Sequence, residues 1–318
     1  MEEIVVSVIM PFYNAAQYLP DTLRSLAQQT ARGFELIAVD DASTDSSPEL
    51  VAAFAEEHPD IPVQLIQGKE NVGDCSARNI GFQHARGRYI CLLDADDLYA
   101  ADYVKQLSEH IRKTDADFVF CGYDKLYEAD RRTVPYEQFK AYPPTAKKRT
   151  VLRWYLLGHT HIGHWAAMYQ RSFLEQNQLR YTDGWHVAGD TEFVCRALLS
   201  CRTVSFLRKS LYLYRIHPGS ITTSTPDASA FGSYGAYLRV LRSIRNPFLK
   251  LFFLVTKQAR ATNIILGKFY RSNVSMPYLY CSKYKILMYQ ILNCVISRPK
   301  DAQVLLRYYI DTYLKKAQ

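Results

Sequence analysis

The chain has 318 residues, of which 48% are hydrophobic and 22% charged, enough for one large domain or two ordinary domains with a substantial core. Its seven cysteines are scattered and show neither a CxxC pair nor zinc-site spacing. No uncharged apolar run reaches the 18 residues of a membrane span, and the first residues lack the pattern of a signal peptide. We therefore expect a cytoplasmic protein with reduced thiols.

The formal net charge of +8 is unevenly distributed. Residues 1–227 carry 24 Lys and Arg against 29 Asp and Glu, a net charge of −5, whereas residues 228–318 carry 15 against 2, a net charge of +13. A break of this size indicates two parts with different roles. We therefore predict a catalytic domain over 1–227 and a separate basic, aromatic region over 228–318.

The first 120 residues alternate apolar runs with amphipathic segments. Five apolar runs are typical of strands: Val5–Met10, Leu36–Val39, Val63–Gln67, Tyr89–Leu93 and Phe118–Cys121. Between them, helical periodicity places Leu19, Leu23 and Leu26 on one face and continues over about residues 48–58, 74–85 and 100–113. This alternation predicts an α/β fold with a mostly parallel, Rossmann-like sheet flanked by helices.

The later residues give a more mixed pattern. Residues 123–150 are polar and contain proline, so we predict a long loop there. Further elements are predicted as a helix near 149–157, a strand at Ala166–Tyr169, a helix over Asp190–Ser200 and strands near 203–207 and 211–216. From about residue 228 onward we expect mostly helices, broken at Pro247 and Pro277 and near Pro299.

Polar residues follow each of the first four predicted strands. They lie in the segments Pro11–Asn14, Asp40–Asp45, Asn71–Gly73 and Asp94–Asp97. Ligands of such sheets bind at the carboxyl ends of the strands. Three carboxylates in four residues after a buried strand are costly unless a cation neutralises them, and a hard divalent ion shared with a phosphorylated substrate does so. The alternative for Asp94–Asp97 alone is a solvated acidic turn.

Four segments together carry a family pattern. They are Ser7–Asn14, Leu36–Asp45, Asn71–Gly81 and Gly87–Asp97. Their order and spacing closely resemble the inverting family 2 glycosyltransferases of GT-A fold, of the bacterial surface-polysaccharide type, over about residues 4–217. The resemblance implies a hexosyl- or N-acetylhexosaminyltransferase that uses Mn²⁺ or Mg²⁺ and a nucleotide-sugar donor, with a UDP-sugar expected, and a glycan or lipid-linked acceptor.

The resemblance separates the roles of the three carboxylates in this DxD motif. Asp96 would bind the metal ion that bridges the diphosphate, a neutralisation that needs no proton transfer. Asp94 would contact ribose or sugar hydroxyls, or the metal through water. The resemblance defines the role of Asp97 least, and this residue is expected to cap the helix predicted from about Ala100.

The resemblance also places residues around the nucleotide. Asp41 would accept a hydrogen bond from the base, Pro11 and Tyr13 would line the base pocket, and Asn71 belongs to the same nucleotide-sugar-binding set. Asp40 has turn stabilisation as an alternative. Arg78 would stack on the base or pair with carboxylates; the alternative is a surface arginine of a helix.

Inversion requires a general base aimed at the acceptor hydroxyl. Family resemblance assigns that role to Asp190, at the start of the helix predicted over 190–200. The alternative is a simple helix N-cap, and Glu192 is the reserve candidate. The family usually has Glu-Asp here, whereas this chain has Gly189 before Asp190, so substrate contacts at this point are expected to differ.

For several histidines and tryptophans, more than one role stays open. His217 matches a later family segment in which a histidine binds the metal or a phosphate oxygen. Trp165 and Trp185 are candidates for stacking on a sugar, with core packing as the alternative. His159, His161 and His164 fit no common zinc spacing, so we interpret them as loop or acceptor-site residues.

The basic region 228–318 combines its charge with ten tyrosines and apolar stretches. Such composition suits peripheral attachment to an anionic membrane at the cytoplasmic face. The alternative is a helical subdomain that packs on the catalytic domain with solvated charges. Nucleic-acid binding is not expected, because no RNA-binding motif occurs. For the whole chain, the alternative function is a catalytically inactive nucleotide-sugar- or glycan-binding module of the same fold.

Overall fold

The computed structural model describes residues 4–136, 147–157, 160–184 and 188–218, together with residues 236, 239, 240 and 244. Residues 1–155 and 159–224 form one compact unit, and residues 156–158 and 225–318 form a second. Almost all of the second unit lies outside the described residues. The predicted boundary at residue 227 and the predicted C-terminal helices therefore stay predictions.

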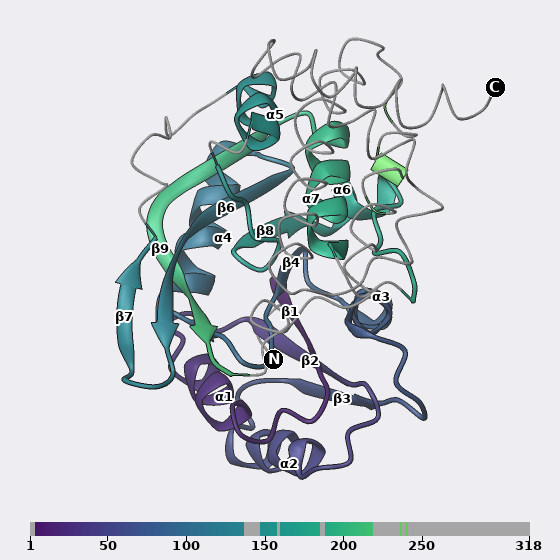
Figure 1. Ribbon diagram of the computed structural model, residues 1–318, viewed down its shortest axis with the longest axis vertical. Coiled ribbons are helices and arrows are strands. Elements are labelled where there is room, and N and C mark those ends of the chain that lie inside the picture. Colours follow the sequence, from purple (N-terminus) through teal and green to yellow (C-terminus); the bar gives the residue numbers. More distant parts are fainter. Residues whose placement is uncertain are drawn as a thin grey trace, which may run out of the picture. The chain divides into compact units, whose positions relative to one another are not determined.

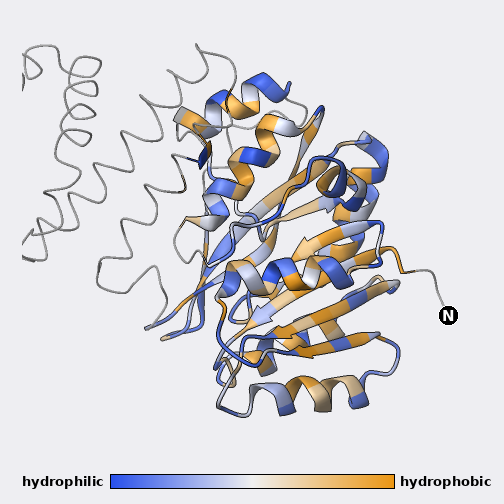
Figure 2. Cartoon of the chain, turned by 90° about the vertical axis from the view of Figure 1, so that its right-hand side faces the viewer, coloured by the Kyte–Doolittle hydropathy of each residue, from blue (hydrophilic) through white to orange (hydrophobic). Residues whose placement is uncertain are grey.

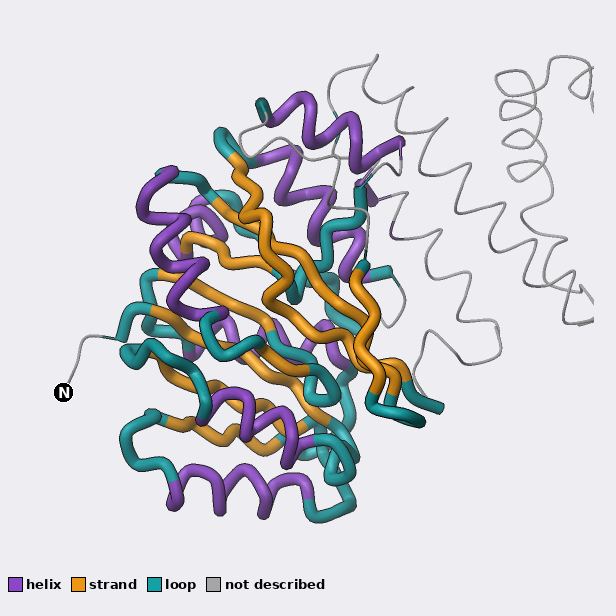
Figure 3. Tube along the Cα trace, turned by 90° about the vertical axis from the view of Figure 1, so that its left-hand side faces the viewer, coloured by secondary structure: helices purple, strands orange, loops and turns teal. Residues whose placement is uncertain are grey.

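Nine strands of the described residues form one sheet (Figures 1 and 3). In spatial order they are β3 (Val63–Gln67), β2 (Phe34–Asp40), β1 (Val6–Phe12), β4 (Tyr89–Leu92), β8 (Ala167–Gln170), β6 (Phe118–Tyr127), β9 (Val204–Ile216) and β5 (Leu98–Tyr99), with β7 (Arg132–Pro135) paired to β6. Strands β1 to β4 are parallel, β8 is antiparallel to both of its neighbours, and β6 is parallel to β9. The carboxyl ends of β1, β2, β4 and β9 consequently meet at one edge.

Helices cover both faces of this sheet (Figure 2). They are α1 (Leu19–Ala27), α2 (Ser47–Glu57), α3 (Asp74–His84), α4 (Tyr103–Thr114), α5 (Lys148–Leu157), α6 (Arg171–Gln176) and α7 (Gly189–Ser200). Side chains of β1 alternate between the faces: Val8 and Met10 join the core cluster that contains Leu23 of α1. On the opposite face, Ile9 packs so closely on α3 that a Cβ at Gly81 would lie 2.3 Å from its Cγ2 atom.

The predicted elements of the first 120 residues are confirmed, with small shifts of their ends. The predicted loop over residues 123–150 is wrong in its first half, because β6 continues to Tyr127 and turns into β7. The two strands predicted near 203–207 and 211–216 are one strand, β9. Exposed polar side chains in β7 and at residues 208–210 of β9 hide the strand pattern there, since hydrophobic alternation requires one buried face.

No helix among the described residues has the length and apolar character needed to cross a bilayer. The cysteines in these ranges are buried free thiols, as predicted: Cys75, Cys91, Cys121, Cys195 and Cys201.

Candidate active site

The loop after β2 is tied to the loop after β3. Asp41 accepts hydrogen bonds from the backbone N–H groups of Val72 (2.7 Å) and Gly73 (2.8 Å). Asp40 accepts one from the N–H of Ser43 (2.9 Å), which is the turn-stabilising role considered above. Both carboxylates are buried. The expected contact of Asp41 with a base stays a prediction, and here its two oxygens fix the entrance to α3.

The two residues expected to line a base pocket differ in exposure. Tyr13 is 49% exposed directly after β1, and its ring is available for stacking. Pro11 is buried within β1. On the side of β4, the carbonyl oxygens of Val5 and Ile9 accept hydrogen bonds from β4 and the residue after it, and the β1–β4 pairing ends at Ile9. Pro11 is the next residue of β1 that faces this side. Pro11 therefore lies just past that pairing, where its missing N–H removes no ladder bond.

Asn71 is exposed in the loop before α3, whereas Arg78 is buried within α3. The guanidinium of Arg78 donates to Asp94 (2.6 Å) and to Asp74. The surface alternative for Arg78 is therefore wrong. These two carboxylates hold the pKa of Arg78 well above its ordinary value despite burial, so it stays charged and links α3 to the acidic loop after β4.

The three carboxylates of the acidic loop have three different partners. Asp94 pairs with Arg78, while Asp96 lies with its Oδ2 3.0 Å from Nε2 of His217. Asp97 is buried and accepts from the hydroxyl of Tyr212 (2.7 Å) and from the N–H of Arg215 (2.7 Å). Burial raises the pKa of both Asp96 and Asp97, and the neighbouring carboxylates raise it further.

The predicted capping role of Asp97 is wrong. Helix α4 begins at Tyr103, and its N-cap position is Asp102. Asp97 instead joins the acidic loop to β9 through Tyr212 and Arg215. The separation of the roles of Asp96 and Asp97 thus has a structural basis, because only Asp96 faces the histidine.

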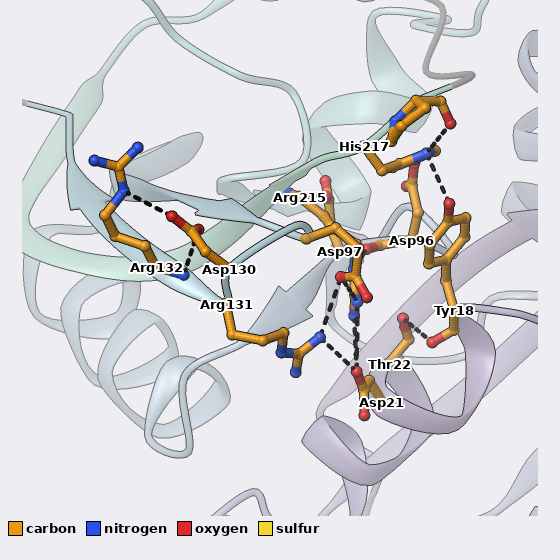
Figure 4. A network of polar contacts seen from close by, with 12 residues as sticks. Tyr18, Asp21, Thr22, Asp96, Asp97, Asp130, Arg131, Arg132, Arg215 and His217 are labelled. Carbon is orange, nitrogen blue, oxygen red and sulfur yellow. Dashed lines mark hydrogen bonds and ion pairs between the residues drawn. The ribbon is translucent and has the colours of Figure 1, made fainter.

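His217 follows β9 and is oriented from both sides of its ring (Figure 4). Its Nδ1 atom lies 2.9 Å from the hydroxyl of Tyr18 and 2.9 Å from the carbonyl oxygen of Pro218, and the Tyr18 ring lies 4.3 Å from its centroid. A carbonyl only accepts, so the contact with Pro218 is a hydrogen bond in the tautomer that carries its proton on Nδ1. Nε2 faces the carboxylate of Asp96, which in its ionised form also only accepts. That second contact requires either another proton or a cation.

The Asp96–His217 pair therefore fits a divalent ion. A carboxylate oxygen and an imidazole nitrogen are suitable ligands for Mn²⁺, and either Mn²⁺ or Mg²⁺ retains positions for water and substrate phosphates. Within the described ranges, no group of three or more His, Cys, Asp and Glu side chains is arranged around a metal position. The pair would supply the protein's share of the ligands and leave the remaining positions to the diphosphate.

Arg215, like Tyr18, is a residue of this region that the sequence analysis missed. It is 1% exposed, and its guanidinium donates to the backbone oxygen of Asp96 (2.6 Å) and pairs with Asp21 (3.3 Å) and Glu128. Figure 4 shows this network beside Asp97. The available signal was a charged residue inside an otherwise apolar strand segment, which requires a buried partner.

Asp190 lies in the first turn of α7 and is half-buried. The N-cap position is Ala188, in the left-handed conformation with φ 59°, so the alternative of a helix N-cap at Asp190 is wrong. Among the described residues none donates a hydrogen bond to the Asp190 side chain. Glu192, the reserve candidate, is buried and accepts a hydrogen bond from Thr182 (3.0 Å), and its role stays a prediction.

The structure accounts for Gly189 in place of the usual Glu. A Cβ atom at this position would lie 2.4 Å from the Sγ atom of Cys75 in α3, which is closer than real atoms approach. Helix α7 begins against α3 with no room for a side chain, and Cys75 fills that space. The departure from the family pattern is therefore matched by a second residue that is distant in the sequence.

The segment 160–184 contributes buried aromatic and histidine side chains. Trp165 is buried and stacks on Tyr212 (4.4 Å) and Tyr214 (5.4 Å), so its place is the core. His164 is also buried, and its ring lies 5.8 Å from that of Tyr181. His161 contacts aromatic rings, while His159 and Trp185 lie outside the described residues.

Comparison with known proteins agrees with this geometry. The family model for glycosyl transferase family 2 matches residues 7–177. Glycosyltransferase EpsJ of Bacillus subtilis is 31% identical over 223 residues, which are 69% of this chain and 63% of EpsJ. Glycosyltransferase GlyG of Streptococcus pneumoniae is 27% identical over 231 residues, 71% of this chain and 75% of GlyG. The match thus spans less than two thirds of EpsJ.

Solved structures show the same fold. S. aureus TarS in complex with UDP-GlcNAc has a TM-score of 0.64 at 21% identity, covering 91% of this chain and 78% of that chain. The mannosyltransferase PcManGT of Pyrobaculum calidifontis, in complex with GDP-Man and Mn²⁺, has a TM-score of 0.59 at 18% identity, covering 96% and 87%. The expected GT-A fold is confirmed, and the chain belongs to glycosyl transferase family 2.

Proposed function

We propose that this chain is a metal-dependent inverting glycosyltransferase. It moves a hexose or N-acetylhexosamine from a nucleotide sugar, preferably a UDP-sugar, to a hydroxyl of a glycan or lipid-linked acceptor in bacterial polysaccharide assembly. The observation that carries the proposal is the meeting of Arg78, Asp94, Asp96 and His217 at the carboxyl edge of the sheet. The UDP-GlcNAc complex of TarS supports the choice of donor.

Asp96 and His217 would hold Mn²⁺ or Mg²⁺ at the leaving diphosphate. When bound, the ion neutralises the charge that develops on the leaving phosphates. The chain's own contribution is orientation, since Tyr18 and Pro218 fix the ring of His217 and Arg215 fixes the backbone of Asp96. Arg78 keeps Asp94 in place on the side of α3.

Asp190 would act on the acceptor. Its carboxylate takes the proton of the acceptor hydroxyl as that oxygen attacks the anomeric carbon from the face opposite the diphosphate. A carboxylate with no hydrogen-bond donor among the described residues is free to accept this proton, whereas Glu192 is occupied by Thr182. Its place in α7 fixes the base on a rigid element.

The test is the pair of substitutions Asp190→Asn and Glu192→Gln. General-base catalysis contributes about 10²- to 10⁴-fold, so Asp190→Asn should lower kcat for transfer by that factor and leave UDP affinity unchanged. Transfer is measured with a panel of UDP- and GDP-sugars, with and without EDTA. If transfer survives Asp190→Asn and is lost in Glu192→Gln, Asp190 is not the base. A wild-type protein that binds UDP-sugars and never transfers or hydrolyses them would establish the inactive binding module.

The basic region supports a further part of the proposal, namely peripheral attachment at the cytoplasmic face of the membrane. Residues 228–318 carry a net charge of +13, and each Lys or Arg near an anionic surface contributes about 1 kcal/mol. The full chain should sediment with phosphatidylglycerol vesicles and be released by salt. Absence of sedimentation at low salt would favour the alternative, a helical subdomain with solvated charges.

A further inference from the structure

The described part of the chain has four buried side-chain polar atoms without a hydrogen-bond partner, and three residues contain all of them. They are Nε of Arg78, Nδ1 and Nε2 of His164, and the hydroxyl of Tyr181. Buried polar groups in native proteins are almost always hydrogen-bonded, because each unpaired group costs roughly 1 to 3 kcal/mol. Unpaired groups scattered over a fold need no common cause, but these lie together.

The three residues are neighbours and are held firmly. The ring of His164 is 5.8 Å from that of Tyr181, and the guanidinium carbon of Arg78 is 5.4 Å from the same ring. Tyr181 stacks on Phe193 of α7 at 4.4 Å. Its backbone N–H donates to Asn79 of α3, and its carbonyl accepts from the same amide, each at 2.9 Å. The unpaired atoms thus belong to an ordered site rather than to a loosely packed surface.

This cluster contacts the acidic loop on one side and α7, the helix that carries the proposed base, on the other. Arg78 donates directly to Asp94 of the loop. On the other side, the charge of Asp190 acts on His164 and raises its pKa, although burial and the charge of Arg78 prevail and lower it to about 3. The imidazole of His164 is therefore neutral at physiological pH and has one donor and one acceptor nitrogen.

The chemistry of the cluster selects a neutral ligand. The charge of Arg78 is already balanced by Asp74 and Asp94, and His164 adds no charge. What remains is one N–H donor from Arg78 and a donor–acceptor pair each from His164 and Tyr181. Sugar hydroxyls offer the same combination of donor and acceptor, whereas a phosphate offers acceptors and negative charge.

We propose that Nε of Arg78, His164 and the hydroxyl of Tyr181 bind the hydroxyl groups of the sugar being transferred, and so determine which donor sugar is accepted. The inference rests on the proposed function, because the transferred sugar must lie between the leaving diphosphate at Asp96 and the base at Asp190. The unpaired atoms gain their partners when the sugar binds. A donor that lacks the matching hydroxyl would leave them buried and unpaired.

The test compares the affinities for UDP-sugars and for UDP by calorimetry with Tyr181→Phe and His164→Gln. Each variant should weaken binding of the preferred UDP-sugar by about 5- to 10-fold, the effect of one neutral hydrogen bond, and leave UDP binding unchanged. Tyr181→Phe should keep or raise the melting temperature, because the lost hydroxyl has no hydrogen-bond partner among the described residues.

The matched control is Tyr103→Phe. Tyr103 is equally buried, but its hydroxyl donates to the carbonyl oxygen of Trp165 at 3.0 Å. This variant should lower the melting temperature and leave the ratio of UDP-sugar to UDP affinity as in wild type. The loss of melting temperature in Tyr103→Phe and its absence in Tyr181→Phe distinguish a group that supports the fold from a group that awaits a ligand.

Three outcomes overturn the sugar subsite. Wild-type affinity in both cluster variants would do so, as would an equal loss of UDP and UDP-sugar binding. An unchanged donor affinity with a raised KM for the acceptor would assign the cluster to the acceptor instead. Failure of the proposed function is a different result, in which the wild-type chain binds neither UDP nor any UDP-sugar.

Discussion

The two ends of the candidate site are both buried, but they differ in whether their polar side chains have hydrogen-bond partners. At the acidic-loop end, Asp97 and Arg215 are buried and each is bonded to groups on other elements. At the Asp190 end, His164 and Tyr181 are also buried, and their side-chain polar atoms have no hydrogen-bond partner in the described part of the chain. We interpret the acidic-loop end as a scaffold that fixes positions before any ligand binds. We interpret the Asp190 end as a subsite whose hydrogen-bond partners come with the ligand.

The largest expected effect concerns the paired end. Arg215→Met should lower the free energy of unfolding by about 3 kcal/mol, because removing one member of a buried ion-pair network leaves its partners uncompensated. The partners at risk are Asp21, Glu128 and the backbone of Asp96. Urea unfolding followed by tryptophan fluorescence measures the change in the free energy of unfolding.

Arg131→Ala is the matched control for Arg215→Met. Arg131 pairs with the same two carboxylates, Asp21 and Glu128, each at 3.1 Å, but its side chain is 52% exposed. Exposed pairs contribute about 1 kcal/mol at most, so this variant should be close to wild type. Equal losses in the two variants would show that burial of Arg215 does not distinguish the paired end.

The next effect is expected at the unpaired end and develops gradually as the pH falls. The pKa of His164 is lowered from 6.5 to about 3 in the folded chain, so the unfolded chain takes up this proton first as pH falls. Folding stability is therefore retained above pH 6.5 and lost toward pH 4, by up to about 1.4 kcal/mol per pH unit.

His164→Gln isolates this contribution, because His110 has a lowered pKa as well and acts in the same direction. Unfolding free energies of wild type and variant are compared at pH 7, 6, 5 and 4. The variant's curve should be flatter than that of wild type. Parallel curves would mean that His164 is not held neutral by its surroundings.

The smallest expected effect tests the orientation of His217. Tyr18→Phe keeps the ring that packs on His217 and removes the hydroxyl 2.9 Å from Nδ1. Loss of such a supporting contact typically lowers metal affinity by about 10-fold or more. Mn²⁺ titration in the presence of UDP, followed by electron paramagnetic resonance, measures it.

Tyr127→Phe serves as the control for Tyr18→Phe, since the Tyr127 ring contacts Arg132 (5.0 Å) at the end of β6. Its Mn²⁺ affinity should equal that of wild type. If Tyr18→Phe also binds Mn²⁺ as wild type does, the carbonyl of Pro218 alone orients the histidine.

The regular half of the fold was predictable from local pattern. Buried runs such as Tyr89–Leu92 and the leucines of α1 show their period directly. The direction of β8 and the β6–β7 hairpin were not, because strand polarity leaves no trace in hydrophobicity and edge segments such as Arg132–Pro135 are exposed. The direction of β8 and the formation of the hairpin depend on the neighbouring strands with which these segments pair, and not on the segments themselves.

The candidate site divides in the same way. Family resemblance predicted Asp94, Asp96, Asp190 and His217 as site residues from residue type and order. For Arg78 two roles were open, and the burial of Arg78 between Asp74 and Asp94 decided between them. Arg215, Tyr18 and Tyr181 were missed, because an arginine or a tyrosine carries no local mark of the groups that it contacts in the folded chain.

By itself, the sequence determined which chemical groups follow each strand, in which order, and hence the family. It could not determine which of those groups are paired. His217 meets Asp96 across 121 positions, and Arg215 meets Asp21 across 194. Only the tertiary packing of the strands and helices brings such groups together, because pairing depends on distance and burial in space. The same packing buries the side-chain polar atoms of His164 and Tyr181 with no hydrogen-bond partner among the described residues, which no property of their own segments indicates.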